Sequence, residues 1–330
     1  MIISKTPFRI SFFGGGTDYP AWFEKYGGAV LSTTIDKYCY ISIRYLPPFF
    51  EHKHRIVYSI VENVKSLNEI KHPVVKAILK YFKIDKGVEI HHDGDLPARS
   101  GLGSSSSFTV GMLNSFYALK GKIISKSQLS KEAIHIEREV LKESVGSQDQ
   151  IAVAHGGFNK IVFHNDHNFR VEAVTLHKER IEQLQRHLML VFTGFSRFAS
   201  EIAAEQIRNT PDKEKELNVM RHMVDKAVAI LNSDRDIVEF GQLLHESWGI
   251  KKHLSTKVSN PEVDCLYESA LKHGAIGGKL LGAGGGGFML LFVRPQNRRK
   301  VADALKGLLE VKFKFENQGS QIIYYNPQEA

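Results

Sequence analysis

The amino-acid sequence predicts an α+β protein built from two domains. A length of 330 residues suits two domains of roughly 150 residues each. Segments rich in β-branched and aromatic residues, which favour strands, are interspersed with segments of helical periodicity along the whole chain. We place the domain boundary near residues 178–186, so that residues 1–180 form the first domain and residues 181–330 the second.

The first domain is expected to combine one sheet with several helices. Its predicted strands share β-branched and aromatic side chains and cover residues 2–13, 29–46, 87–92, 156–164 and 169–176, the last two forming a hairpin. Its predicted helices carry apolar residues at helical spacing and cover residues 73–82, 105–119 and 127–143. Pro73 suits the first turn of its helix, and we expect Ser127 or Ser130 to cap the third.

The second domain is expected to begin with a buried strand, HLMLVFTG at residues 187–194. Helical patterns then cover residues 197–232 and 235–252, and Asn260-Pro261 is typical of the start of another helix. The stretch GGKLLGAGGGGFMLLFV, residues 277–293, predicts two strands around a glycine turn. A further helix and a closing strand, SQIIYY, are predicted to complete the chain.

The composition indicates a globular protein without a membrane-spanning segment. Apolar residues make up 42% and charged residues 24% of the chain, and no stretch approaches the ~18 successive apolar residues of a membrane span. The first residues lack the pattern of a signal peptide. Cys39 and Cys265 give neither a disulfide framework nor a zinc site. We therefore expect a cytoplasmic protein with no membrane partner.

The formal net charge of +8 favours small anionic ligands over nucleic acid. Basic residues are spread along the chain, and it contains no basic arm and no nucleic-acid-binding motif. An excess of positive charge attracts small anions into a site. We expect no nucleic-acid partner, and the sequence leaves the choice between a monomer and a homodimer open.

Three glycine-rich stretches border predicted strands or helices: FFGGGTDYP at 12–20, SGLGSSSS at 100–107 and LLGAGGGGF at 280–288. No lysine follows the glycines as a Walker A loop requires, and the dinucleotide fingerprint lacks its third glycine and its acidic residue. Main-chain N–H groups of a glycine loop at a helix N-terminus form an anion site. The alternative for the serines is helix capping alone. Three such stretches predict a shared pocket.

These stretches resemble, in order, the three motifs of the GHMP kinase family, named for galactokinase, homoserine, mevalonate and phosphomevalonate kinases. The matching segments are TPFRISFFGGGTDYP (6–20), LPARSGLGSSSS (96–107) and KLLGAGGGGF (279–288). The resemblance implies a two-domain fold, with an N-terminal domain like ribosomal protein S5 domain 2 and a ferredoxin-like C-terminal domain. It also implies ATP as a substrate, bound in the cleft between the domains.

The second motif is the family's phosphate loop, and the resemblance assigns ATP to it. The residues carried over are Pro97, Gly101, Leu102, Gly103, Ser104, Ser105, Ser106 and Ser107. Ser105 matches the serine that ligates Mg²⁺, and Glu137 matches the helical glutamate that does the same. Glu139, two positions further on, would face another side of the helix and is therefore not expected to bind Mg²⁺.

Asp149 and Arg9 are the catalytic residues that the resemblance implies. The element Gly146-Ser-Gln-Asp-Gln follows Glu137 at the spacing found in galactokinases. Asp149 would orient the attacking hydroxyl and accept its proton. Arg9 would lie beside it, keep it ionised and offset charge as the phosphoryl group moves. The alternative for Arg9 is a surface ion pair on a strand.

The first motif departs from galactokinases, because Gly15-Gly16 stands where those enzymes carry Glu-His. The GGGTDYP pattern is most similar to bacterial D-glycero-D-manno-heptose 7-phosphate kinases. That group phosphorylates the anomeric hydroxyl of a C7-phosphorylated sugar on the way to GDP-heptose. The expected substrate-binding residues are Gly15, Gly16, Thr17, Asp18, Tyr19, Gly284 and Gly285.

A sugar that already carries a phosphate needs a second anion site, and FTGFSRFASEI (192–202) is the candidate. It offers Ser196 and Arg197 at a predicted helix start, where an anion is favoured. The alternative is an ordinary capped helix with Arg197 in solvent.

Three other functions stay open from the sequence. The chain could be a GHMP kinase for another sugar, such as fucose or glucuronic acid. It could be a decarboxylase of the diphosphomevalonate type, or a non-catalytic galactokinase-like ligand sensor. The complete set of Ser105, Glu137 and Asp149 argues against a role limited to binding.

Overall fold

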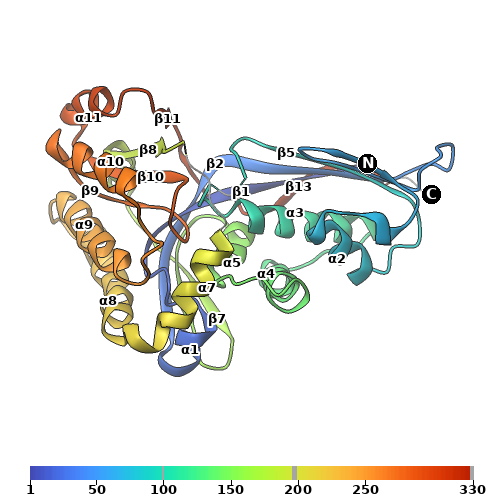
Figure 1. The fold of residues 1–330 in the computed structure, drawn as a ribbon, viewed down its shortest axis with the longest axis horizontal. Helices are drawn as coiled ribbons and strands as arrows, with labels where there is room; N and C mark the ends of the chain where they lie inside the picture. The colour runs from blue at the N-terminus through green and yellow to red at the C-terminus, as the bar shows by residue number, and fades with distance from the viewer. Residues whose placement is uncertain (99, 195–198, 328–330) are drawn as a thin grey trace.

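The computed structural model describes residues 1–98, 100–194 and 199–327, and these residues form two sheets with helices packed around them (Figure 1). In the larger sheet the strands run in the order β13-β1-β2-β5-β3-β4, with β12 and β6 also paired to β2 and β7 paired to β6. In the smaller sheet the order is β11-β8-β10-β9. The strands of the larger sheet are β1 (Ile2–Phe13), β2 (Gly28–Tyr45), β3 (His54–Val57), β4 (Val61–Val64), β5 (Val88–Gly94), β6 (Phe158–Phe163), β7 (Phe169–Ala173), β12 (Phe315–Glu316) and β13 (Gln321–Tyr325). Those of the smaller sheet are β8 (Leu188–Phe192), β9 (Ala275–Leu280), β10 (Phe288–Val293) and β11 (Leu309–Val311).

The described helices cover the chain between the strands. They are α1 (Pro20–Tyr26), α2 (Pro73–Tyr81), α3 (Ser104–Leu119), α4 (Lys126–His135), α5 (Gln148–His155), α6 (Lys178–His187), α7 (Ala199–Asn209), α8 (Glu214–Leu231), α9 (Val238–Lys252), α10 (Pro261–Lys272) and α11 (Arg298–Ala304). Short 3₁₀ turns span Leu67–Glu69, Thr210–Lys213 and Pro295–Asn297. None of these helices combines the length and the apolar character needed to cross a lipid bilayer.

The long antiparallel pair β1–β2 confirms the prediction of two strands in one sheet. Side chains of β1 alternate between buried and partly exposed over residues 2–5, and all of them are buried from Thr6 to Phe13, so both faces of this part of the strand are covered. The β1–β2 register shifts between Pro7 and Phe8 and again between Ser11 and Phe13. These irregularities flank Arg9, and such bulges change the direction in which a side chain projects.

Helix α3 packs against β1 and β2 on one side and against α4 and α5 on the other (Figure 1). Its residues are buried around the whole circumference, from Ser106 to Leu119, because it lies inside the domain. The phosphate-loop glycines therefore lead into a rigid, central helix. This position fixes the loop against the end of the sheet.

The helix predicted over residues 127–143 is shorter and begins earlier than expected. Ser125, and neither Ser127 nor Ser130, caps α4 by accepting a hydrogen bond from the main-chain N–H of Gln128 (3.2 Å). The α-helix ends at His135 and continues as a π-helical turn over Ile136–Val140. A π-turn is rare and often lies at a functional site. Here it carries Glu137.

The pattern predicted as one helix over residues 197–232 divides into α7, a 3₁₀ turn at Thr210–Lys213, and α8. Pro211 accounts for this break, because proline cannot donate the hydrogen bond of a helix interior. The other helix predictions of the second half, α9 and α10, are confirmed. Asn260 caps α10 through the N–H of Val263 (2.9 Å).

The last two strands return to the larger sheet. β12 pairs with β2 and β13 pairs with β1, both antiparallel. The start of β1 and the end of β13 lie at the end of this sheet that is remote from the smaller sheet (Figure 1). The proposed boundary between residues 180 and 181 stays a prediction, and the pairing of β12 and β13 shows that segments from both sides of it build one sheet.

Candidate active site

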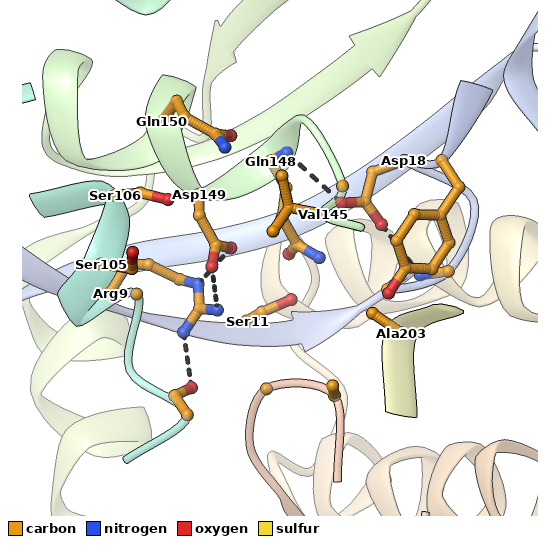
Figure 2. A pocket seen from close by; sticks show the side chains of 18 of the residues that line it. Arg9, Ser11, Asp18, Ser105, Ser106, Val145, Gln148, Asp149, Gln150 and Ala203 are labelled. Carbon is orange, nitrogen blue, oxygen red and sulfur yellow. Dashed lines mark hydrogen bonds and ion pairs between the residues drawn. The ribbon is translucent and has the colours of Figure 1, made fainter. Parts of the chain in front are cut away.

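A cleft between the two sheets brings the three glycine-rich stretches together. Its lining combines the β1 end, the loop before α1, the phosphate loop, the start of α5 and the loop after β9. Figure 2 shows Arg9 and Asp149 near the phosphate-loop serines, with Asp18 on the other side of Gln148. Stretches that are far apart in sequence therefore meet in one pocket, as the sequence predicted.

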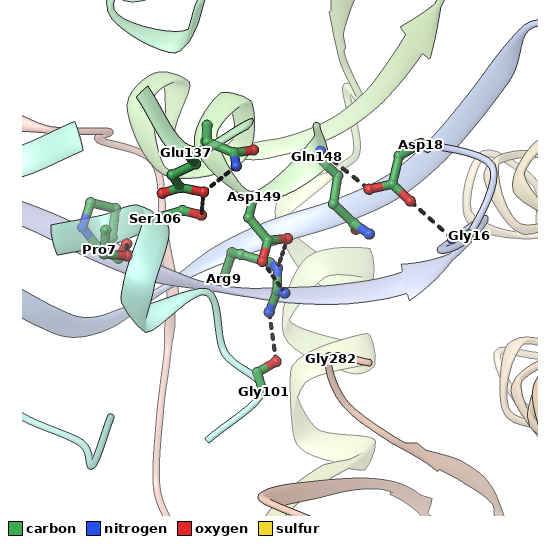
Figure 3. Close-up of polar contacts among 12 residues, drawn as sticks. Pro7, Arg9, Gly16, Asp18, Gly101, Ser106, Glu137, Gln148, Asp149 and Gly282 are labelled. Atoms are coloured by element: carbon green, nitrogen blue, oxygen red, sulfur yellow. Dashed lines mark hydrogen bonds and ion pairs between the residues drawn. The ribbon is translucent and has the colours of Figure 1, made fainter. Parts of the chain in front are cut away.

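Arg9 and Asp149 form a bidentate ion pair at the centre of the cleft. Arg9 Nε donates to Asp149 Oδ1 (2.7 Å) and Nη2 donates to Oδ2 (2.6 Å). The remaining nitrogen, Nη1, donates to the carbonyl of Gly101 (2.7 Å), as Figure 3 shows. Arg9 is buried, whereas a quarter of the Asp149 side chain is exposed to the cleft. Two parallel hydrogen bonds fix the plane of the carboxylate and leave acceptor positions free for a ligand.

The phosphate loop is anchored to β1 through its main chain. The N–H of Arg9 donates to the carbonyl of Leu102 (3.0 Å), and the Ser107 hydroxyl donates to the carbonyl of Pro7 (2.9 Å). Gly101 and Gly103 have φ values of +83° and +76°, which favour glycine. Helix α3 begins at Ser104, directly after this loop. The N-terminus of α3 therefore faces the cleft, where it favours an anion.

Glu137 lies behind this loop, fully buried and held by two neighbours. Its Oε2 accepts hydrogen bonds from the Ser106 hydroxyl (3.1 Å) and from Gln150 Nε2 (2.5 Å). Its other oxygen, Oε1, is buried without a hydrogen-bond partner among the described residues. Burial raises the pKa of Glu137 to about 7. A buried carboxylate oxygen without a donor fits a site for a cation.

The serine that forms a hydrogen bond with Glu137 is Ser106, whereas the resemblance assigned Ser105 and Glu137 to the same Mg²⁺ ion. Ser105 is exposed at the rim of the cleft. Glu139 is exposed and pairs with Lys142 (3.4 Å), so it does face away from Glu137 as predicted. No cluster of three or more His, Cys, Asp or Glu in the described ranges could hold a metal alone. Mg²⁺ commonly takes only one or two protein ligands and completes its shell with water and phosphate oxygens.

Asp18 is buried on the far side of the cleft and organises two loops. It accepts hydrogen bonds from the N–H of Gly16 (2.9 Å) and, less closely, of Gln148 (3.3 Å). Burial raises the pKa of Asp18, and the two N–H donors partly offset this effect. A Cβ on Gly146 would lie 1.9 Å from Asp18 Oδ2, so a side chain at this position would displace the Asp18 carboxylate. Asp18 thus ties the loop before α1 to the start of α5.

Several predicted residues support the loops without lining the cleft. Thr17 donates to the carbonyls of Gly14 (2.8 Å) and Ala29 (2.9 Å), and Gly285 donates through its N–H to the carbonyl of Val258 (2.9 Å). The predicted residues outside the lining are Thr17, Pro97, Leu102, Ser107, Gly284 and Gly285. Ser196 and Arg197 lie outside the described residues. The predicted residues in the lining are Arg9, Gly15, Gly16, Asp18, Tyr19, Gly101, Gly103, Ser104, Ser105, Ser106, Glu137 and Asp149.

Two lysines that the sequence did not single out also line the cleft, Lys251 from α9 and Lys279 from β9. Both are almost completely buried. Lys279 could have been noticed as the charge within a glycine-rich, otherwise apolar strand. Lys251 gave no such signal, because the sequence alone does not distinguish it from the adjacent Lys252, which is only partly buried.

The chain matches two family models. The N-terminal domain model of the GHMP kinases matches residues 68–157, and the C-terminal model of the same family matches residues 226–310. These matches contain the phosphate loop, Glu137 and Asp149 in the first model, and both lysines in the second.

Individual relatives extend over nearly the full chain. A D-glycero-alpha-D-manno-heptose 7-phosphate kinase from Campylobacter jejuni is 32% identical over 92% of this chain and 93% of its own. A galactokinase from Pyrococcus furiosus is 26% identical over 96% of this chain and 95% of its own. The crystal structure of a D-glycero-D-manno-heptose 1-phosphate kinase from Bacteroides thetaiotaomicron superposes with a TM-score of 0.78, 26% identity and coverage of 98% and 99%. The fold, both domain matches and the near full-length relative show that this protein belongs to the GHMP kinase family.

Proposed function

We propose that the protein transfers the γ-phosphoryl group of ATP to the C1 hydroxyl of D-glycero-D-manno-heptose 7-phosphate, giving the 1,7-bisphosphate for GDP-heptose synthesis. The main evidence for phosphoryl transfer is the Arg9–Asp149 ion pair, which lies between the phosphate loop and the loop that contains Asp18. A hydroxyl bound against Asp149 would therefore have an anion site on one side and polar acceptors on the other. That arrangement suits phosphoryl transfer to an alcohol.

The phosphates of ATP would bind at the start of α3. The N–H groups of residues 101–106 and the helix dipole supply donors and positive potential there. Glu137 and a phosphate-loop serine, Ser105 or Ser106, would hold Mg²⁺, since Glu137 Oε1 has no other partner among the described residues. When bound, Mg²⁺ supplies positive charge that stabilises the phosphate oxygens.

Asp149 would position the sugar hydroxyl and accept its proton. Both carboxylate oxygens are fixed by Arg9, and each retains a lone pair for a further donor. Arg9 is buried and held additionally by Gly101, so the orientation of the carboxylate is set before the substrate arrives. Positioning of this kind is most of what a phosphoryl-transfer enzyme contributes.

The heptose phosphate assignment is supported by the first motif and by the relatives. Gly15 and Gly16 line the cleft at the positions where the resemblance places a glutamate and a histidine in galactokinases, so two contacts to galactose are missing here. Two relatives that match this chain over nearly their whole length are described as heptose phosphate kinases. Their descriptions place the phosphate of the substrate at position 7 in one case and at position 1 in the other. The position of the phosphate is thus the property that an assay has to decide.

A substrate panel tests this proposal. ADP release would be measured with heptose 7-phosphate, heptose 1-phosphate, unphosphorylated heptose, galactose, fucose and glucuronic acid, and the product would be located by ³¹P NMR. We expect heptose 7-phosphate to be used far better than every other sugar, with the new phosphate at C1. A preference for fucose would instead favour the function of another relative, a bifunctional fucokinase from Arabidopsis thaliana that is 24% identical over 89% of this chain and 30% of its own.

A further inference from the structure

Lys251 and Lys279 place two basic side chains in the wall of the cleft that the roles assigned above leave unused. Lys251 is 5% exposed and Lys279 is 2% exposed, and both line the same cleft as Arg9 and Asp149. Lysine is almost never this deeply buried unless it is paired with an opposite charge. The partners of these two ammonium groups therefore decide their function.

Neither ammonium group has a carboxylate partner in the described part of the chain. Lys251 Nζ donates to the carbonyls of Gly282 (2.5 Å) and Leu280 (3.3 Å), and Lys279 Nζ donates to the carbonyl of Phe12 (2.8 Å). The carboxylate nearest to the reaction, Asp149, is already paired to Arg9. Because an ammonium group carries three N–H donors, one on Lys251 and two on Lys279 have no protein acceptor among the described residues.

The balance of fixed charge in the cleft is positive on this side. Burial lowers the pKa of Lys251 to about 8, with Arg9 acting in the same direction and Asp18 and Asp149 opposing it. Burial also lowers the pKa of Lys279, and the neighbouring Lys251 adds to that effect. Buried cations without a counter-ion destabilise a folded protein, so an anionic ligand that supplies the counter-ion is favoured.

The contacts of Lys251 lead directly to the phosphate loop. A Cβ on Gly282 would lie 2.6 Å from the Cα of Gly101, so the loop after β9 packs against the phosphate loop main chain to main chain (Figure 3). The carbonyl of Gly101 in turn accepts from Arg9. Lys251, Gly282, Gly101 and Arg9 therefore form a continuous chain of contacts from the second half of the protein to the catalytic pair.

We propose that Lys251 and Lys279 together form a binding site for phosphoryl oxygens in the wall of the cleft facing Arg9. The site rests on the proposed kinase function and adds a group of residues to it. A phosphoryl group in this cleft has two sources, the γ-phosphoryl group of ATP and the phosphate that the sugar carries. Both present the same chemistry, a dianion with several acceptor oxygens, to the ammonium groups.

The decisive experiment compares Lys251→Met and Lys279→Met with Lys252→Met. Lys252 is adjacent on α9 but is partly exposed and pairs with Asp264 (3.1 Å), so it is a matched control outside the cleft. For each protein, the melting temperature would be measured alone, with Mg²⁺ and the ATP analogue AMPPNP, and with heptose 7-phosphate. Steady-state kinetics with ATP and sugar would accompany these measurements.

We expect each cleft variant to lower kcat/KM on the order of 10²- to 10³-fold, as removal of one charge-stabilising donor does. The ligand whose phosphoryl group binds the lysines, AMPPNP or heptose 7-phosphate, should raise the melting temperature of the variant much less than that of the wild type. A ligand at about 100 times its wild-type Kd would then sit near the Kd of the variant, which removes most of its stabilising effect. Lys252→Met should behave like the wild type in both respects.

These measurements distinguish the two sources of the phosphoryl group, ATP and the sugar phosphate. Loss of the AMPPNP response, with a fall in kcat, assigns the lysines to the γ-phosphoryl group. Loss of the response to heptose 7-phosphate, with a rise in its KM and no change for unphosphorylated heptose, assigns them to the phosphate of the sugar. If both ligands stabilise both cleft variants as much as the wild type, relative to each variant alone, the lysines do not bind phosphoryl groups.

Failure of the proposed substrate would be visible separately. In that case the wild type itself would neither respond to heptose 7-phosphate nor phosphorylate it, while the AMPPNP comparison between wild type and variants would still test the lysines. A purely structural role would lower the melting temperature of the unliganded variants and leave the ligand responses intact.

Discussion

Gly101 of the phosphate loop and Gly282 of the loop after β9 are in direct main-chain contact. A Cβ on Gly282 would lie 2.6 Å from the Cα of Gly101, and a Cβ on Gly101 would lie 2.5 Å from the carbonyl oxygen of Leu281. Such distances are far below those of ordinary contacts, so neither loop tolerates a side chain at this point. The two halves of the protein thus meet at the proposed anion site.

Gly282→Ala is therefore expected to impair activity by displacing the phosphate loop. Its φ of +72° adds backbone strain of roughly 1 kcal/mol for any other residue. Gly121 is a matched control, because it has a similar φ of +65° but open space where a methyl group would lie. A displacement of about 1 Å at a catalytic site can cost 10²-fold in rate. We expect this order of loss in kcat for Gly282→Ala, whereas Gly121→Ala should lose only stability. Equal kcat values for the two variants would show that the contact does not position the loop.

Glu137→Gln should raise the Mg²⁺ concentration needed for half-maximal rate. The amide keeps the hydrogen bonds to its neighbours in shape but removes the negative charge of the unpartnered oxygen Oε1. We expect an increase of at least about tenfold, the size of effect found even for residues that only orient a ligand of the metal. Titration of Mg²⁺ at saturating ATP measures it. Glu139→Gln, an exposed neighbour, should titrate like the wild type, and identical behaviour of the two variants would exclude Glu137 from the metal site.

Lys251→Met is expected to change how the stability of the unliganded protein depends on pH. The pKa of Lys251 is about 8 in the folded protein and 10.5 ordinarily. Below pH 8 both states carry the proton, so the full cost of the buried charge is present. Between pH 8 and 10.5 the folded protein releases the proton while the unfolded chain retains it, and the stability of the wild type rises. The melting temperature of the variant should exceed that of the wild type most at about pH 7, and the difference should shrink by about pH 10. A difference that is constant with pH would contradict a buried charge at this position.

The central elements of the fold were predictable because their patterns are local. The β-branched and aromatic residues of β1 and β2, the proline at the start of α2 and the Asn260 cap of α10 are each signals from a few neighbouring residues. The π-turn at residues 136–140 was not predictable, since apolar spacing does not distinguish it from an α-helix. The pairing of β12 and β13 with the first sheet depends on contacts across nearly the whole chain, which local sequence does not encode.

Site residues that belong to a sequence motif were predictable from the order of the motifs. Site residues that are important because they are buried were not. Arg9 and Asp149 were inferred from a resemblance between motifs, and the structure places them in a bidentate pair. Lys251 and Lys279 matter because they are buried together, and burial is a property of the packed molecule. The hydroxyl that donates to Glu137 belongs to Ser106, one residue after Ser105. The sequence could not distinguish the two serines, because which of them faces inward depends on how α3 packs.

The most direct test of the proposed chemistry is the turnover of Asp149→Asn. Asparagine keeps the size of the side chain but cannot accept the proton of the sugar hydroxyl, and it loses the ion pair with Arg9. Steady-state kinetics should show a fall in kcat of roughly 10²- to 10⁴-fold, the usual contribution of a positioned base. Calorimetric titration should show AMPPNP binding nearly unchanged. Asp166→Asn changes an exposed aspartate that accepts hydrogen bonds from Asn168, and it should match the wild type in both measurements. Turnover by Asp149→Asn close to that of the wild type would contradict the placement of the Arg9–Asp149 pair at the reacting hydroxyl.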